Sequence, residues 1–181
     1  MRGPRRIILI RHCESSGWEP DAPLTARGRR QAEDLADRLA ALAVDALVSS
    51  PHVRARQSIE PFAAASGLDV RVDDRLVEKV LARHSIDGWR AAVRRSFSDP
   101  DWKLPGGESG SEAQRRGRAA VEAALSEAHG LCAVVTHGQL MTLVLRSIDA
   151  RFGFHEWALL SSPDGYFVDQ VAGDAWSVHR W

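Results

Sequence analysis

The chain has 181 residues, 44% of them hydrophobic, so we expect one domain, residues 1–181, with a real core. Basic and acidic residues number 24 each, which gives no argument for a nucleic-acid or membrane partner. No apolar stretch approaches membrane-spanning length, residues 7–10 are too short for a signal core, and two cysteines make no disulfide framework. We therefore expect a cytoplasmic protein.

The first predicted element is a strand over residues 7–10, with the sequence Ile-Ile-Leu-Ile. A short apolar run of this kind is typical of a strand buried on both faces of a parallel sheet. Arg11 and His12 then lie at its carboxyl end, where ligands bind in open α/β sheets. A guanidinium beside an imidazole suits a phosphoryl group, with the arginine as anion clamp and the histidine as nucleophile or base.

Helical and strand patterns alternate along the rest of the chain, which predicts an α/β fold. Thr25 is a plausible N-cap for the first helix, and Pro51 is expected in the first turn of the second helix. The predicted elements are a helix to about residue 42, a strand at 46–48, a helix to about 65, a strand at 70–72, helices at 86–97 and 110–128, a strand at 131–135, a helix at 140–148 and a hairpin of 167–171 with 176–178.

Polar residues follow three of these strands. In a parallel sheet such strand ends share one edge, and helix N-termini there add partial positive charge. Two imidazoles and two guanidiniums at this edge would form an oxyanion site. The residues concerned are Arg11, His12, Ser49, Ser50, Arg54, Thr136 and His137.

Other chemistries fit less well. The chain has no His-x-x-x-His or Cys-x-x-Cys spacing, no P-loop and no Gly-x-Ser-x-Gly, so we expect neither a metal ion nor a cofactor. Cys13 is a weaker nucleophile candidate than His12, on the argument that positive neighbours depress a thiol pKa. Trp18, Trp89 and Trp102 fit an apolar wall near the site or ordinary packing equally well. Solvated surface positions are expected for Arg29, Arg30, Arg56, His52, His84, His129, His155 and His179.

Six segments, in order from residue 7 to about 145, resemble the motifs of the histidine phosphatase superfamily, the phosphoglycerate-mutase-like proteins. They are Arg-His-Cys-Glu-Ser at 11–15, Pro-Leu-Thr-Ala-Arg-Gly-Arg-Arg-Gln-Ala at 23–32, Ser-Ser-Pro-His-Val-Arg-Ala-Arg-Gln-Ser at 49–58, Leu-Val-Glu at 76–78, Pro-Gly-Gly-Glu-Ser at 105–109 and Val-Thr-His-Gly at 135–138.

The resemblance implies a three-layer α/β/α sandwich with a mostly parallel central sheet and a metal-independent phosphoric monoester hydrolase. By the same resemblance, His12 attacks phosphorus to give a phosphohistidine, while Arg11, Arg54 and His137 hold the phosphoryl oxygens. Neighbouring guanidiniums should push the pKa of His12 down and keep it neutral. Glu78 would protonate the leaving oxygen and then activate water, although it can also be interpreted as an exposed structural carboxylate.

Four positions depart from the family pattern. Cys13 replaces a glycine, which predicts strained or reshaped backbone. Trp18 stands where many members have an asparagine that helps to bind phosphate. Residues 79–83 replace the common Gly-x-Trp-Glu-Gly, and Gln139 replaces a frequent second glycine.

Within the family that the chain resembles, mutases usually carry a longer insertion between these motifs, whereas only about thirty residues separate Glu78 from Glu108 here. The sequence therefore favours a phosphatase of a small phosphorylated metabolite. A phosphoglycerate-type mutase is the alternative enzyme. A phosphate-binding regulatory module without turnover is the alternative from another class. The sequence identifies neither the substrate nor the oligomeric state.

Overall fold

The computed structural model describes residues 6–170 and 175–181. Six strands form one sheet in the order β3-β2-β4-β1-β5-β6. The strands are β1 (Arg6–Arg11), β2 (Val44–Ser49), β3 (Val70–Val72), β4 (Leu131–Thr136), β5 (Asp164–Gln170) and β6 (Trp176–Arg180). The helices are α1 (Ala26–Ala40), α2 (Val53–Ser66), the short 3₁₀ helix η1 (Asp74–Leu76), α3 (Trp89–Ser98), α4 (Gly110–Glu127), α5 (Gly138–Arg146) and α6 (Phe154–Leu159).

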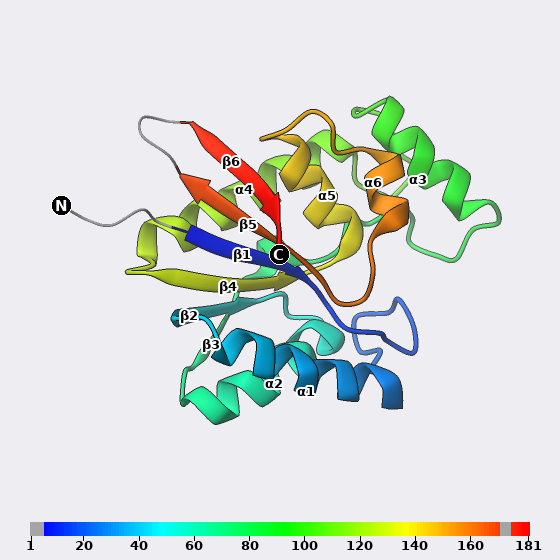
Figure 1. Ribbon diagram of the computed structural model, residues 1–181. Helices are drawn as coiled ribbons and strands as arrows, with labels where there is room; N and C mark the ends of the chain where they lie inside the picture. The colour runs from blue at the N-terminus through cyan, green and yellow to red at the C-terminus, as the bar shows by residue number, and fades with distance from the viewer. Residues whose placement is uncertain (1–5, 171–174) are drawn as a thin grey trace.

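The sheet is mostly parallel, as predicted. β1 pairs in parallel with β4, and β2 pairs in parallel with both β4 and β3. β5 and β6 add an antiparallel edge next to β1. Figure 1 shows α1 and α2 on one face of the sheet and α3, α4, α5 and α6 on the other, so the architecture has three layers.

Strand β1 explains why both faces are covered. Its apolar residues are fully buried and alternate between the two faces, as strand geometry requires. Ile7 and Leu9 belong to the core cluster that includes residues of α4 and α5. Ile8 and Ile10 belong to the second cluster, which includes residues of α1 and α2. Because both faces of β1 are buried, the polar residues next to it in the sequence lie at its ends.

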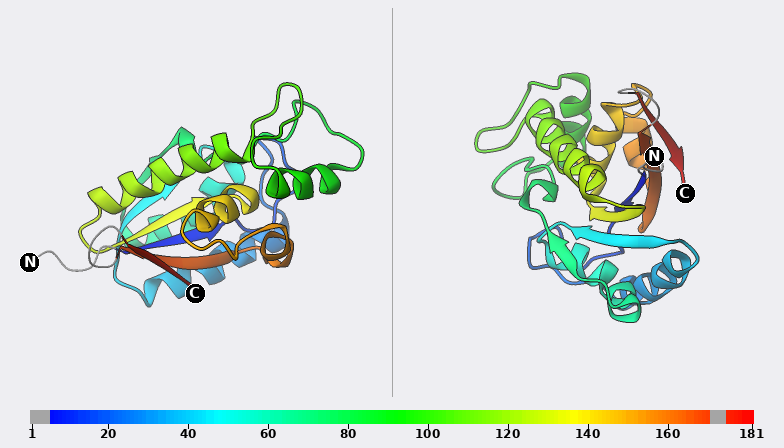
Figure 2. Two further views of the ribbon diagram at one scale, coloured as in Figure 1. Left: turned by 90° about the horizontal axis from the view of Figure 1, so that it is seen from above. Right: turned by 90° about the vertical axis from the view of Figure 1, so that its left-hand side faces the viewer.

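The carboxyl ends of β1, β2 and β4 lie at the same end of the molecule. Seen from above in Figure 2, the loop after β1, α3 and α6 gather at this end. The functional residues are therefore expected where these loops and short helices meet.

In the described residues, no helix is both long and apolar enough to span a membrane.

Several predicted boundaries need correction. Pro51 lies before α2, because that helix begins at Val53 with His52 as its N-cap. The sequence pattern does not predict η1 or α6, because segments of three and six residues are too short for an apolar period to identify them. The predicted hairpin is confirmed over its described part, whereas Val171 lies outside the described residues.

Candidate active site

Strand pairing brings the polar strand ends together. Arg11 is in register with Thr136, and the His12 N–H donates to the Thr136 carbonyl over 3.0 Å. The Ser50 N–H donates to the Val135 carbonyl over 2.9 Å. Backbone hydrogen bonds therefore hold His12 and Ser50 beside the end of β4, which His137 directly follows.

The loop after His12 is fixed to α1 by its own motif residues. Thr25 caps α1 by accepting from the Gly28 N–H, and its hydroxyl donates to the Glu14 carboxylate over 2.7 Å. The Glu14 N–H donates to the Gln31 side chain over 2.9 Å. A Cβ on Gly28 would collide with the Glu14 carbonyl oxygen, so only glycine allows this close approach. The spacing of Thr25, Gly28 and Gln31 thus positions the residues that follow His12.

The His12 ring has a defined protonation state. Its Nδ1 lies 2.6 Å from the Cys13 carbonyl oxygen, which can only accept, so Nδ1 carries the proton. Its Nε2 accepts from Arg54 Nε over 3.2 Å and is therefore unprotonated. Burial, with smaller contributions from Arg54 and Arg11, lowers the pKa of His12 to about 3. A neutral imidazole with an unprotonated Nε2 is the nucleophilic form.

His137 lies beside His12 and is completely buried. The two ring centroids are 5.1 Å apart, and His137 Nε2 lies 2.8 Å from the Ser50 hydroxyl. The Ser50 oxygen also accepts from the His52 N–H over 3.3 Å. If the Ser50 hydroxyl donates to Nε2, the His137 proton is on Nδ1, facing away from Ser50. Burial lowers the pKa of His137 well below its ordinary value, with a further contribution from His12.

His52 is not the solvated side chain that the sequence predicts. It is half-buried, and its ring centroid lies 4.7 Å from that of His137. Burial lowers the pKa of His52 to about 4, and the positive charges of Arg54 and Arg116 make smaller contributions in the same direction. Nothing in the spacing of the chain signals this contact, because it arises from the turn before α2 packing against the end of β4.

The two arginines are held by carbonyl oxygens. Arg54 is buried and donates to the Glu19 carbonyl over 2.7 Å, whereas Arg11 donates to the Leu160 and Ser161 carbonyls over 2.9 and 3.2 Å. Burial lowers the pKa of Arg11 and Arg54, and the charge of Glu78 acts in the opposite direction on both. The predicted guanidiniums therefore lie at one site, within electrostatic range of the same carboxylate.

Glu78 is half-buried at the start of α5. Its carboxylate accepts from the Gln139 N–H over 3.1 Å and from the Leu140 N–H over 2.9 Å. This places a negative charge at the positive end of the α5 dipole, next to His137. Glu78 is therefore not exposed, but its position at a helix start agrees with the structural interpretation, and a capping role and a chemical role are compatible.

Arg116 holds the segment that carries Glu78, and the sequence analysis did not single it out. Its guanidinium donates to both oxygens of Glu108 over 2.7 Å. It also donates to the carbonyls of Arg75, Val77 and Glu78. The Glu of the Pro-Gly-Gly-Glu-Ser motif therefore fixes Arg116, and Arg116 fixes the backbone around Glu78.

Unpaired nitrogens concentrate at this end of the sheet. Among the described residues, four buried side-chain nitrogens have no hydrogen-bond partner. Three of them, Arg11 Nε, His52 Nδ1 and His137 Nδ1, belong to the group just described, and the fourth is Arg71 Nη2. Buried polar atoms are normally satisfied, so three unpaired nitrogens together indicate a site for an external acceptor.

Two expectations about departures from the family pattern are wrong. Cys13 is fully buried, and burial raises the pKa of its thiol to about 11, so the expected low-pKa thiolate is absent. Glycine accounts for every positive φ in the described residues, so the Cys13 backbone carries no such strain. Trp18 is 58% exposed, and Trp102 packs under Arg95, whereas Trp89 contacts Trp157.

The buried histidines should make stability depend on pH. An unfolded histidine binds a proton near pH 6.5, whereas folded His137 stays neutral, so acidification favours the unfolded state and stability falls below that pH. We expect His137→Asn to reduce the loss of unfolding free energy between pH 7 and 5 by about 2 kcal/mol. Urea unfolding at both pH values measures this, with the exposed His129→Asn as control. An unchanged pH dependence in His137→Asn would contradict the buried neutral histidine.

In the described part of the chain, no group of three or more His, Cys, Asp or Glu side chains is arranged to hold a metal ion. The chemistry available at the edge is that of imidazoles, guanidiniums and carboxylates, with Glu78 and Asp164 both acting on Arg11.

Comparison with known proteins identifies the family. A sequence profile described as the histidine phosphatase superfamily (branch 1) matches residues 7–181. The chain belongs to this superfamily. The resemblance predicted from the six motifs is therefore confirmed.

Similar proteins are found in sequence and in structure. The probable phosphoglycerate mutase GpmB of Salmonella choleraesuis (strain SC-B67) is 31% identical over 172 residues, covering 84% of this chain and 77% of that protein. A mycobacterial glucosyl-3-phosphoglycerate phosphatase solved with VO3 has a TM-score of 0.79 at 24% identity, covering 98% of each chain. An Entamoeba histolytica phosphoserine phosphatase has a TM-score of 0.76 at 17% identity, covering 96% of this chain and 94% of that one. These two structures share the fold.

Proposed function

We propose that this histidine phosphatase hydrolyses phosphate monoesters of small metabolites through a phosphohistidine at His12. The observation that carries the proposal is the unprotonated His12 Nε2, bonded to Arg54 and surrounded by nitrogens without partners. A phosphoryl group supplies the acceptor oxygens that these nitrogens lack. Inorganic phosphate and vanadate should therefore act as competitive inhibitors.

In the first step, the lone pair of His12 Nε2 forms a bond to phosphorus, and the bond to the leaving oxygen breaks. Arg54 shifts its hydrogen bond from Nε2 to a phosphoryl oxygen, while Arg11 and His137 Nδ1 donate to the other oxygens. These donors are in place before the substrate arrives, so little reorganisation opposes the step. The cation pair also balances the charge of the phosphoryl group.

Glu78 is the proposed proton carrier. Its acid form gives a proton to the departing oxygen, and the resulting carboxylate then takes a proton from the attacking water. Water adds to phosphorus, the N–P bond breaks, and the electron pair returns to His12 Nε2. The Glu78 carboxyl group lies at the start of α5, within electrostatic range of both guanidiniums, and this position supports the role.

Glu78→Gln tests this role through the leaving group. We expect the rate for an alkyl phosphate to fall about 10²- to 10⁴-fold, because a poor leaving group needs the proton. The rate for 4-nitrophenyl phosphate should fall much less. Steady-state kinetics on both substrates measure the difference, with Glu60→Gln, on the exposed side of α2, as the matched control. An equal loss for both substrates would remove the acid role from Glu78.

A mutase is the second candidate, because the Salmonella relative carries the name of a probable phosphoglycerate mutase. The two functions separate by product. A phosphatase releases inorganic phosphate from phosphoglycerate, whereas a mutase, primed with a bisphosphorylated glycerate, moves phosphate between hydroxyls with little release. Phosphorus NMR of one reaction mixture distinguishes the two.

A regulatory module without turnover is the third possibility. It would bind phosphate but hydrolyse aryl phosphates no faster in wild type than in a variant lacking the His12 imidazole. For the phosphatase, we propose a small phosphorylated substrate and a cytoplasmic location. A screen of phosphorylated metabolites with purified protein identifies the substrate.

A further inference from the structure

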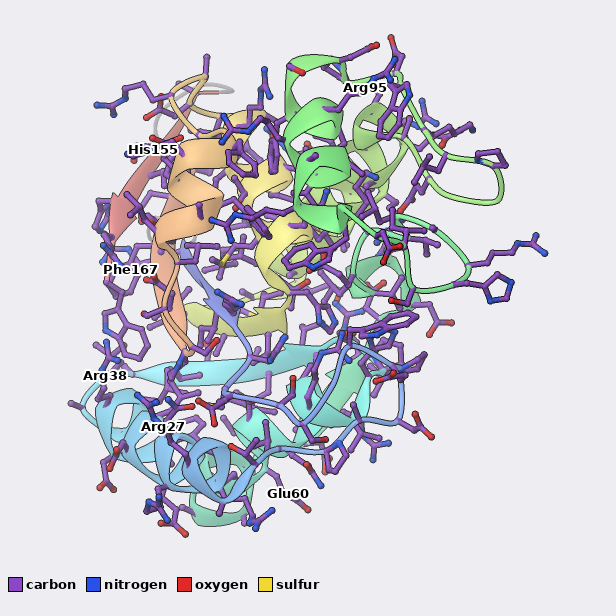
Figure 3. The ribbon with its side chains drawn as sticks, turned by 90° about the vertical axis from the view of Figure 1, so that its right-hand side faces the viewer. Arg27, Arg38, Glu60, Arg95, His155 and Phe167 are labelled. Carbon is purple, nitrogen blue, oxygen red and sulfur yellow. The ribbon has the colours of Figure 1, made fainter. Side chains whose placement is uncertain are left out.

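Two nitrogens from distant parts of the chain converge on Gly138, the first residue of α5. A Cβ built on Gly138 would lie 3.2 Å from Arg11 Nε and 3.5 Å from Trp157 Nε1. Arg11 ends β1, whereas Trp157 belongs to α6, near the other end of the chain. Figure 3 looks onto this end of the molecule, where α6, which carries the labelled His155, lies beside α5. Glycine at this position therefore allows both nitrogens to approach the start of α5 closely.

Both nitrogens can only donate hydrogen bonds. A guanidinium has no acceptor, and an indole N–H is a donor only, so the two cannot satisfy each other. Arg11 Nε is buried and has no partner among the described residues. The geometry therefore calls for an acceptor oxygen that comes from outside the chain.

The Trp157 indole is oriented by its neighbours. Trp89 packs edge-on at 6.1 Å between ring centroids, and Phe154 packs at 5.4 Å. The Arg90 guanidinium lies 5.6 Å from the Trp157 ring. The carbonyls that bind Arg11 come from Leu160 and Ser161, directly after α6, so Arg11 and α6 are tied together. A donor held in this way needs little ordering when a ligand binds.

We propose that the Trp157 indole N–H donates to a phosphoryl oxygen together with Arg11 Nε, making Trp157 a phosphate-binding residue. The inference rests on the proposed function and extends it, because it assigns part of the phosphoryl site to α6. The ligand is a tetrahedral oxyanion, either the phosphoryl group of the substrate or the phosphate released from it.

The direct test follows the indole N–H signals of wild-type protein by ¹⁵N–¹H NMR during titration with inorganic phosphate. The chain has six tryptophans, so sequential assignment identifies the Trp157 signal without any variant. We expect this signal to move downfield with the same apparent affinity as the His12 ring signals. The Trp176 signal, from β6 beneath Arg118, should stay in place. A Trp157 signal that does not move while the His12 signals titrate would overturn the inference.

A substitution gives the second arm. Trp157→Phe keeps an aromatic ring but removes the donor, so inhibition by phosphate and vanadate should weaken about 10-fold. Trp176→Phe is the matched control and should leave both inhibition constants unchanged. Equal inhibition of wild type and a folded Trp157→Phe would contradict the inference. Absence of hydrolysis in wild type, with phosphate still moving the Trp157 signal, would instead refute only the proposed function.

Discussion

His12→Ala is expected to lower kcat/KM for 4-nitrophenyl phosphate by about 10⁴-fold or more, because it removes the proposed nucleophile. The Nδ1 bond to Cys13 orients the ring, and the Nε2 lone pair faces Arg54, so no other described group offers an equivalent nucleophile at this edge. His137 is beside it, but its Nε2 is bonded to Ser50.

Steady-state kinetics with the same substrate measure the His12→Ala effect. His155→Ala, an exposed histidine of α6, is the matched control and should retain wild-type activity. Circular dichroism should show both variants folded. A folded His12→Ala protein that keeps more than about a hundredth of the wild-type rate would require a different nucleophile.

Arg54→Lys is expected to lower kcat/KM by about 10²- to 10³-fold, although the charge is retained. Arg54 makes two contacts in different directions, from Nε to His12 and from Nη1 to the Glu19 carbonyl. A lysine ammonium cannot reproduce this fork or donate to two phosphoryl oxygens in one plane. Arg54 therefore acts through geometry as well as charge.

The matched control for Arg54→Lys is Arg56→Lys, an exposed arginine on the same helix. It should leave kinetics unchanged. Comparison with Arg54→Met separates the two contributions, since methionine removes the charge as well. Arg54→Lys activity within about threefold of wild type would show that the guanidinium geometry is not needed.

The local sequence predicts the strands whose carboxyl ends carry the site residues. The apolar run of β1 specifies burial on both faces, and polar residues directly after it can only lie at the carboxyl edge. The same argument places Ser50 after β2 and His137 after β4. Parallel pairing then brings these positions together, which is why Arg11, His12, Arg54 and His137 could be grouped before the structure was known.

The missed features depend on tertiary contacts. His52 and Arg116 occupy polar helix-start and helix-surface positions that are usually solvated, and only the packing of distant segments brings them to the site. Helix α6 has only six residues, which is too short a segment for an apolar period to identify a helix. Positive neighbours predict a low pKa for the Cys13 thiol, but burial, which the local sequence does not show, raises it.

The central claim is that His12 Nε2 becomes covalently phosphorylated. Rapid quenching of wild-type enzyme during turnover, followed by peptide mass spectrometry, tests it most directly. The account predicts a phosphoryl group on the peptide containing His12 that is lost in acid and survives in base, and that is absent from His12→Ala. A base-labile adduct, or one on a peptide that does not contain His12, would contradict it.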